Sequence, residues 1–257
     1  QYTTIIHSPP AQEVVDERHY IGYVPLGPFV GRIIMAGSLK AYAQHLAWRL
    51  GTTPAALYER QRALVRDGIL EQSEGRGPGS GVQIGPYPVA LLLVAVLATD
   101  SLTETAETVR ILAAAKSTAA SGRCPLTGES TFVEAIARVL DGAHDHWRKI
   151  ESITVRRTSG HGVIEYGDNL SHMSSIFAAK LPTDAKLRAS TRLVINAMLT
   201  RALIIDIVTD LKKISELEQR SRFAALQTKV DSKKRVPSRA PGPKSANRGH
   251  PKEGKKQ

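Results

Sequence analysis

The sequence predicts a mainly α-helical protein that carries two small β elements and ends in a disordered basic segment. Three observations lead to this prediction. Apolar residues recur at helical spacing along most of the chain, and two short stretches alternate between apolar and polar residues around glycine-rich turns. The last residues contain almost no apolar side chains. A segment of that kind cannot bury enough surface to offset the entropy lost on ordering.

The same patterns divide the 257 residues into four parts. Residues 1–27 mix proline, glycine and charges, and we interpret them as an N-terminal arm. Residues 28–89 are expected to form a first small domain, and residues 90–219 a helical domain with one β-hairpin and a long last helix. Residues 220–257 are the disordered basic tail.

Positive charge is concentrated in that tail. The whole chain carries +11, from 35 basic and 24 acidic residues. Ser221–Gln257 holds eleven basic and two acidic residues, or +9 (11 − 2), which leaves +2 (11 − 9) for the other 220 residues. The tail is therefore a candidate for binding acidic partners such as nucleic acid, whereas the body must be judged on its own residues.

Cysteine usage and hydropathy restrict the compartment. The single cysteine, Cys124, cannot form a disulfide within the chain, which is typical of a reducing compartment. Gln1–Val24 has no apolar stretch of the secretory kind, and the longest apolar run, Val89–Ala98, is about half of what spans a bilayer. We expect a cytoplasmic protein, located with the bacterial nucleoid, and no role in a membrane.

The first domain begins with two amphipathic helices behind a short helix expected at Pro28–Gly37. In the first, Leu39–Leu50 has one apolar stripe, Ser38 stands at the N-cap and Gly51 follows the last turn. The second starts after Thr52 or Thr53 with Pro54 in its first turn, where a missing N–H costs nothing. It ends at Gly68, and its inward residues are Leu57, Gln61, Leu64 and Val65.

A hairpin should follow the second helix. Ile69–Gln72 is expected to form a short strand and Val82–Ile84 its return strand. Between them, Gly75–Gly81 is too rich in glycine to adopt regular structure.

The segment SLKAYAQHLAWRLGTTPAALYERQRALVRDGIL resembles the winged helix-turn-helix domain of bacterial transcriptional regulators. The likeness lies in the helix ending Leu50-Gly51, the three-residue turn, the helix opening Thr53-Pro54, and the Gly68-Ile69-Leu70 start of the wing. It covers Ser38–Val89, with Gly75–Gly81 at the wing tip. The resemblance implies that the second helix enters the major groove of duplex DNA.

Helical geometry selects the residues that would contact that DNA. With Leu57 and Leu64 turned inward, the outward face has small residues near its start and two arginines one turn apart, a side chain suited to guanine or to phosphate. Backbone N–H groups at the helix start offer a phosphate site. The candidate DNA-binding residues are Thr52, Thr53, Ala55, Tyr58, Glu59, Arg60, Arg62 and Arg66, with Arg76 at the wing tip.

Further helices are expected beyond the wing, at Pro88–Thr99, Thr103–Thr118 and Ser130–Arg148, and a β-hairpin at Ser152–Tyr166. The last helix should run from Thr183 to about Glu218. Because its centre is apolar nearly all round, it must be buried within its domain or between subunits. We favour a homodimer through the stripe Leu187–Leu211; the alternative is a monomer in which this helix packs against the preceding ones.

Neither a catalytic nor a metal site is expected. In a helix, His144 and His146 point away from each other, so they cannot share one ion. Gly128-Glu129-Ser130-Thr131-Phe132 lacks the second glycine of a nucleophile elbow. We interpret Cys124 as a passive thiol and His161 as part of a turn. No enzyme activity and no cofactor are expected.

These observations favour a sequence-selective DNA-binding regulator of transcription from a bacterium or a mobile element. The body would recognise sites on double-stranded DNA, and the tail would add affinity through phosphate contacts. Two alternatives stay open: an accessory DNA-binding protein of replication or partition, and a protein- or RNA-interaction scaffold in which the helix-turn-helix is vestigial.

Overall fold

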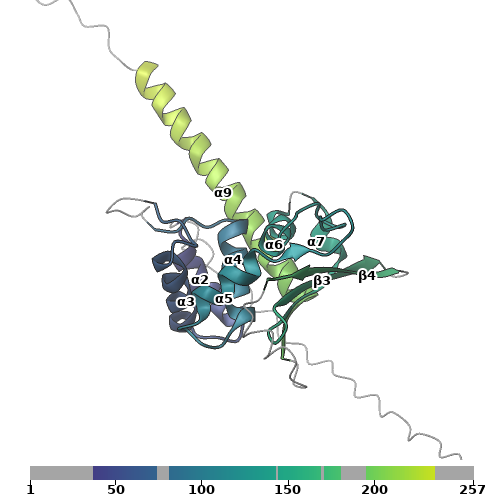
Figure 1. Ribbon diagram of the computed structural model, residues 1–257. Helices are drawn as coiled ribbons and strands as arrows, with labels where there is room; N and C mark the ends of the chain where they lie inside the picture. The colour runs from purple at the N-terminus through teal and green to yellow at the C-terminus, as the bar shows by residue number, and fades with distance from the viewer. Residues whose placement is uncertain (1–36, 74–80, 143, 169–170, 181–194, 235–257) are drawn as a thin grey trace, which may run out of the picture.

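A computed structural model describes residues 37–73, 81–142, 144–168, 171–180 and 195–234. Figure 1 places helices α2 and α3 at one end of the body, the sheet at the other, and α4 between them. In chain order the elements are α2 (Leu39–Arg49), α3 (Pro54–Arg66), α4 (Pro86–Ala98), α5 (Thr105–Ala113), β1 (Lys116–Ser117), α6 (Phe132–Asp141), α7 (His146–Lys149), β2 (Ile150–Arg156), β3 (His161–Asp168), β4 (Ser171–Ala178), β5 (Asn196–Thr200) and α9 (Arg201–Lys234).

Side-chain caps start the first two helices where the sequence placed them. The Ser38 hydroxyl accepts a hydrogen bond from the Ala41 N–H at 3.3 Å and opens α2. The Thr53 hydroxyl accepts from the Ala56 N–H at 3.1 Å and opens α3, with Pro54 at its first position. Such caps satisfy N–H groups that have no partner inside the helix. The predicted pair of helices separated by a short turn is therefore present.

The predicted wing strands do not form a regular ladder. Ile69 and Leu70 continue as a bend after α3, and only single bridges join Ser73 to Gly81 and Ser38 to Gln83. Backbone bonds from the Leu39 N–H to the Val82 carbonyl (2.8 Å) and from the Ile84 N–H to the Gly37 carbonyl (3.0 Å) hold the return segment beside the start of α2. Arg76 and the wing tip lie outside the described residues.

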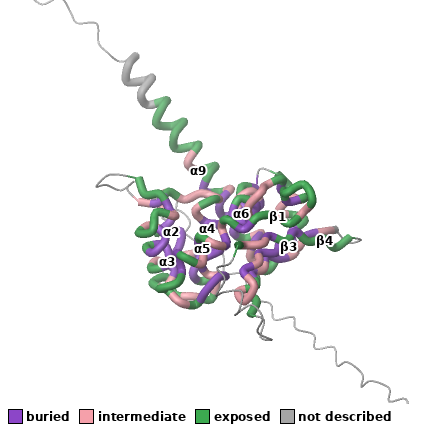
Figure 2. Tube along the Cα trace, viewed as in Figure 1, coloured by how far each residue is buried: buried purple, intermediate pink, exposed green. Residues whose placement is uncertain are grey.

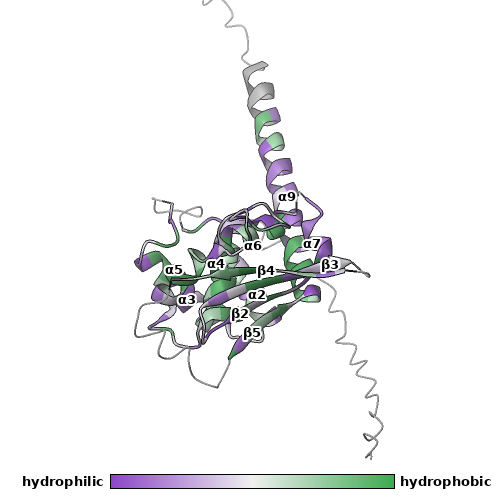
Figure 3. Cartoon of the chain, turned by 45° about the vertical axis from the view of Figure 1, so that its right-hand side comes forward, coloured by the Kyte–Doolittle hydropathy of each residue, from purple (hydrophilic) through white to green (hydrophobic). Residues whose placement is uncertain are grey.

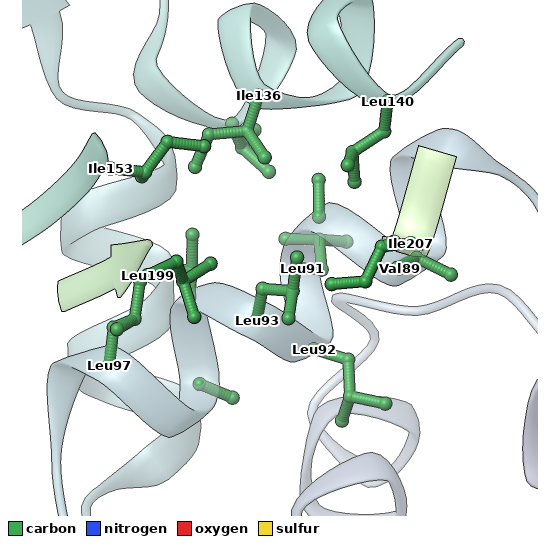
Figure 4. Close-up of a cluster of buried hydrophobic side chains, with 14 of the residues drawn as sticks. Val89, Leu91, Leu92, Leu93, Leu97, Ile136, Leu140, Ile153, Leu199 and Ile207 are labelled. Carbon is green, nitrogen blue, oxygen red and sulfur yellow. The ribbon is translucent and has the colours of Figure 1, made fainter. Parts of the chain in front are cut away.

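Helix α4 forms the centre of the core. Nine of its thirteen residues are buried, from Val89 to Ala98, because the helix is apolar on all sides and other elements surround it. It packs against α3, α5, α6 and the sheet. Figure 4 shows Leu91 and Leu93 of α4 pointing toward Ile136 of α6 and Leu199 of β5.

The five strands form one antiparallel sheet in the order β1-β4-β3-β2-β5. Figure 3 shows its strands lying over the helices. In the register, Ile153 of β2 pairs with Ile164 of β3 and with Leu199 of β5, and these three side chains are buried on the helix-covered face. Gly162 lies under the ring of Phe132, where a Cβ atom would come within 2.6 Å of ring carbons. A glycine is therefore required for α6 to pack this closely.

This sheet corrects the predicted fold class of a mainly α protein with one hairpin. The Ser152–Tyr166 hairpin is present, but as two strands, β2 and β3, of five. The long helix expected from Thr183 to Glu218 is wrong at Asn196–Thr200, which is β5, and α9 starts at Arg201. In β5 the side chains alternate, with Leu199 buried and Met198 exposed. The all-round apolar composition of this stretch concealed that two-residue period.

Two other predicted helices are shorter than expected. The helix predicted at Thr103–Thr118 ends at Ala113 and is followed by β1. The helix predicted at Ser130–Arg148 ends at Asp141, because Gly142 adopts a left-handed conformation (φ 65°) that closes α6, and α7 is a separate turn.

Helix α9 leaves the body and continues well beyond it (Figure 1). Its first turns are buried, with Ile204, Ile207 and Val208 in the core, whereas Ser221–Gln227 are exposed (Figure 2). The predicted disordered tail from residue 220 is thus helical as far as Lys234. Part of the predicted dimer stripe is therefore core of this chain, because Val208 and Leu211 of α9 and Leu199 of β5 are buried, whereas Met198 of β5 is exposed. The 183–194 part of that stripe lies outside the described residues.

Candidate nucleic-acid interface

Helix α3 separates a buried face from an exposed one. Leu57, Gln61 and Leu64 point into the core, and Val65 is half-buried. The exposed face presents Ala55, Glu59, Arg62 and Arg66. Ala63 is buried. The outer face therefore consists of one small residue near the N-terminus followed by charged side chains along the next three turns.

Each arginine of the outer face contacts an acidic neighbour. Arg62 Nη1 lies 3.0 Å from Glu59 Oε1, one turn earlier, and the arginine side chain is 63% exposed. Arg66 Nε lies 3.4 Å from Asp67 Oδ1, and this arginine is 74% exposed. Ion pairs as exposed as these contribute about 0–1 kcal/mol. Both guanidinium groups are therefore available to a stronger acceptor.

The start of α3 is an exposed edge. Thr53 is exposed and Thr52 half-buried, and the Thr53 hydroxyl is engaged as the helix cap. Tyr58 is half-buried, and Lys40 of α2 places its ammonium 4.6 Å from the centre of the Tyr58 ring. This cation–π contact adds a positive charge that the sequence prediction did not include. Only the α2–α3 packing brings the two residues together.

Arg60 departs from the prediction because its side chain is buried. Its Nη2 donates to the carbonyl oxygens of Thr99 at 3.2 Å and Asp100 at 3.5 Å, where α4 ends. Burial is the main reason that the pKa of this guanidinium is lowered. A cation at a helix C-terminus is favourable because the last carbonyls have no partner in the helix. Arg60 joins α3 to α4 and is not part of the exposed face.

Arg110 of α5 joins the interface near the end of α3. Its Nη2 lies 3.6 Å from Asp67 Oδ2 and donates to the Asp67 carbonyl oxygen at 3.4 Å. Asp67 thus lies between two exposed arginines, Arg66 and Arg110. The sequence reasoning missed Arg110 because 43 residues separate it from Asp67.

A cluster of charged residues attaches α2 to α9 behind this face. Arg49 contacts Asp206 and Asp210, and His45 Nε2 lies 3.3 Å from Asp210 Oδ2. Asp210 is nearly buried. Through these contacts the long helix holds the helix pair in one orientation on the body.

The expectation that His144 and His146 point away from each other is wrong, because the helix predicted to hold both ends at Asp141 and their ring centres lie 5.3 Å apart. Across the described residues, no three His, Cys, Asp or Glu side chains are grouped so that they could hold a metal ion. The buried Cys124 Sγ donates to the Ser175 hydroxyl at 3.3 Å. His161 is the first residue of β3.

No helix in the described ranges has both the length and the apolarity to cross a membrane. The chain matches no protein-family model, no curated protein and no solved structure.

Proposed function

We propose that this chain binds double-stranded DNA sequence-selectively and acts as a regulator of transcription in the cytoplasm. The observation that carries the proposal is the outer face of α3. This face lies on the second helix of a capped pair of helices. It carries the small residue Ala55 near its start and then presents Arg62 and Arg66 one turn apart. An α-helix with such a face fits the major groove.

The energies of the two competing contacts favour this use of the arginines. A bidentate contact between arginine and guanine contributes about 1–3 kcal/mol of discrimination between bases. The exposed ion pairs that Arg62 makes with Glu59, and Arg66 with Asp67, are worth about 0–1 kcal/mol. The ion pairs are therefore too weak to hold either arginine back from a guanine.

Further positive charges would bind phosphate and not bases. Lys40 lies against Tyr58 of α3, and Arg110 lies against Asp67 at the C-terminal end of α3. The C-terminal part of the chain adds +3 within Ser221–Lys234 and +6 within residues 235–257, together the +9 counted above (3 + 6). Phosphate contacts supply affinity with little sequence information. This division assigns selectivity to α3 and general affinity to the other charges.

The experiment measures the affinity of the full chain for a duplex chosen by selection from random DNA. Arg62→Ala and Arg66→Ala should each reduce specific affinity by about tenfold, which corresponds to about 1.4 kcal/mol. Arg148→Ala is the matched control, because Arg148 is also an exposed arginine paired with an acid three residues away, Asp145 at 3.2 Å, but lies on α7. Equal losses for Arg62 and Arg148 would contradict the proposal, as would failure to select any duplex.

A protein-interaction role is the second candidate, and one observation favours it. Trp48 on α2 is 84% exposed, which is unusual for so large an apolar side chain. The acids Glu59 and Asp67 also offset the positive charge of the α3 face. In this case Trp48→Ala would abolish binding of a protein partner, while the arginine variants would leave the affinity for DNA unchanged.

A further inference from the structure

Strand β5 is an edge of the sheet. Among the described residues it pairs on one side only, with β2. On that side the Arg157 N–H donates to the Ile195 carbonyl oxygen at 2.9 Å. In an antiparallel strand both backbone groups of a residue point to the same side, and the side alternates along the strand. The backbone groups of Ile195, Ala197 and Leu199 therefore point toward β2. Those of Asn196, Met198 and Thr200 point away from the sheet.

The two edges of the sheet differ in how they discourage pairing with another chain. Natural proteins protect edge strands by shortness, charge, proline or bulges. β1 has two residues, one of them Lys116. β5 has five residues, Asn-Ala-Met-Leu-Thr, without charge or proline, and its central Met198 is 57% exposed. β5 has none of these protections.

We infer that β5 is the interface for a second copy of this chain, and that the two sheets join along it into one continuous antiparallel sheet. A two-fold axis at Met198 places this residue opposite its counterpart and Asn196 opposite Thr200 of the second copy. In that register every outward N–H of one strand meets an outward C=O of the other. The strand is therefore complementary to itself.

The chemistry of β5 selects a second copy as the occupant. Antiparallel pairing of like strands brings identical side chains together at the axis, which is unfavourable for charged residues and favourable for Met198. The two-fold arrangement uses the β5 edge of both copies, so association stops at two chains. This surface retains Met198 of the apolar stripe Leu187–Leu211 suggested by the sequence, whereas Val208 and Leu211 of that stripe are buried in α9. The inference does not depend on DNA binding, because it concerns the free protein.

Sedimentation of the full chain without DNA tests this interface. We expect a dimer at high micromolar concentration and a monomer for Met198→Lys, because two like charges would meet at the axis. The control is Met173→Lys on β4, since Met173 is 50% exposed but lies away from β5, and this variant should stay dimeric. A monomeric parent chain, or a Met198→Lys variant as dimeric as the parent, would overturn the inference.

Cross-linking tests the register without relying on a charged substitution. Residues directly opposite in a hydrogen-bonded antiparallel pair have Cα atoms about 5.5 Å apart, which a disulfide can span. Met198→Cys should therefore give a covalent dimer on oxidation, and Met173→Cys should not. The native Cys124 is buried and does not compete. Equal cross-linking of the two variants would show random collision, which excludes the proposed register.

Discussion

Arg49 of α2 and Asp210 of α9 join the α2–α3 helix pair to the long helix α9, with Arg49 Nη2 3.3 Å from Asp210 Oδ2. The Asp210 side chain is 8% exposed, and His45 lies against the same oxygen. Burial, and secondly the Asp210 carboxylate, raises the pKa of Tyr42, so this phenol stays neutral. The Asp210 carboxylate thus contacts Arg49 and His45 of α2 and also acts electrostatically on Tyr42.

Removal of the Asp210 carboxylate should destabilise the attachment of α2 to α9. We expect Asp210→Ala to lower the free energy of unfolding by about 1–3 kcal/mol, because Arg49 loses a largely buried partner. Asp206→Ala is the control, since Asp206 also contacts Arg49 but is 57% exposed, and it should cost less than about 1 kcal/mol. Denaturant unfolding measures both. Equal costs would show that burial of Asp210 does not matter.

Arg60 and Arg62 are two residues apart and should behave in opposite ways. Arg60→Ala should destabilise the chain by about 1–3 kcal/mol, because the Thr99 carbonyl loses its donor. The affinity of the remaining folded protein for DNA should be unchanged. Arg62→Ala should leave the melting temperature almost unchanged and weaken specific binding. Thermal unfolding and binding measured on the same samples separate the two effects, and a reversal of the pattern would contradict the assigned faces of α3.

Arg157 closes the end of α4 from the sheet side. Its Nε donates to the Leu97 carbonyl at 2.7 Å, and its Nη1 lies 2.6 Å from Asp100 Oδ2. Arg157→Lys should cost about 1–3 kcal/mol, because one ammonium cannot reproduce the planar set of donors. Denaturant unfolding at neutral pH measures this loss, and a variant as stable as the parent would contradict it.

The hydrogen bond from Arg157 is the main cause that lowers the pKa of Asp100 below its ordinary value of 3.8, and the positive charge of Arg157 is the second cause. A lowered carboxyl pKa gives stability that is present above the ordinary value and is lost as the pH falls through the folded-state value. The effect should be small because Asp100 is largely exposed. In Arg157→Lys the carboxyl should titrate closer to 3.8, as NMR can follow. An unchanged Asp100 titration would argue against the contact.

Gly162 should not tolerate a methyl group. Gly162→Ala would place its Cβ within 2.6 Å of the Phe132 ring, and we expect a loss of about 1–3 kcal/mol from overpacking. The double variant Gly162→Ala with Phe132→Leu should be less destabilised than the sum of the two single variants. Additive losses in a double-mutant cycle would show that the two residues do not touch.

Removal of residues 235–257 should weaken DNA binding without changing the preferred sequence. This segment carries seven basic residues and one acidic residue, or +6 (7 − 1). Because phosphate contacts release counterions, the truncated chain should show a shallower dependence of log K on log salt. Titrations of two different duplexes at several salt concentrations measure this. A changed preference with an unchanged salt slope would reverse the roles assigned to α3 and the C-terminal charges.

Local signals predicted the helices α2 and α3, and long-range contacts escaped prediction. Ser38 and Thr53 act on N–H groups three residues away, so both caps could be read from the sequence. Arg60 could not be placed correctly, because the Thr99 carbonyl that buries it lies 39 residues away along the chain. Helical periodicity therefore placed Arg62 and Arg66 correctly on the exposed face of α3 but missed the burial of Arg60.

The sheet escaped prediction for a related reason. β4 is polar along most of its length, and only Ser175 and Phe177 are buried, so it lacks a strong alternating pattern. It is a strand because β3 pairs with it along its whole length, from His161–Ala178 to Asp168–Ser171. β5 was hidden in an apolar run that continues into α9. Whether such segments form strands depends on the strands that they pair with, and the periodicity of a single sequence does not reveal those pairings.

The projecting end of α9 also governs how this molecule moves through solution. A helix of 34 residues is about 51 Å long at 1.5 Å per residue. A compact chain of 257 residues has a radius of gyration of about 18 Å. The frictional coefficient should therefore exceed that of a sphere of equal mass, and the protein should elute early from gel filtration even as a monomer. Sedimentation equilibrium or static light scattering, which report mass independently of shape, can distinguish such drag from the presence of a second chain.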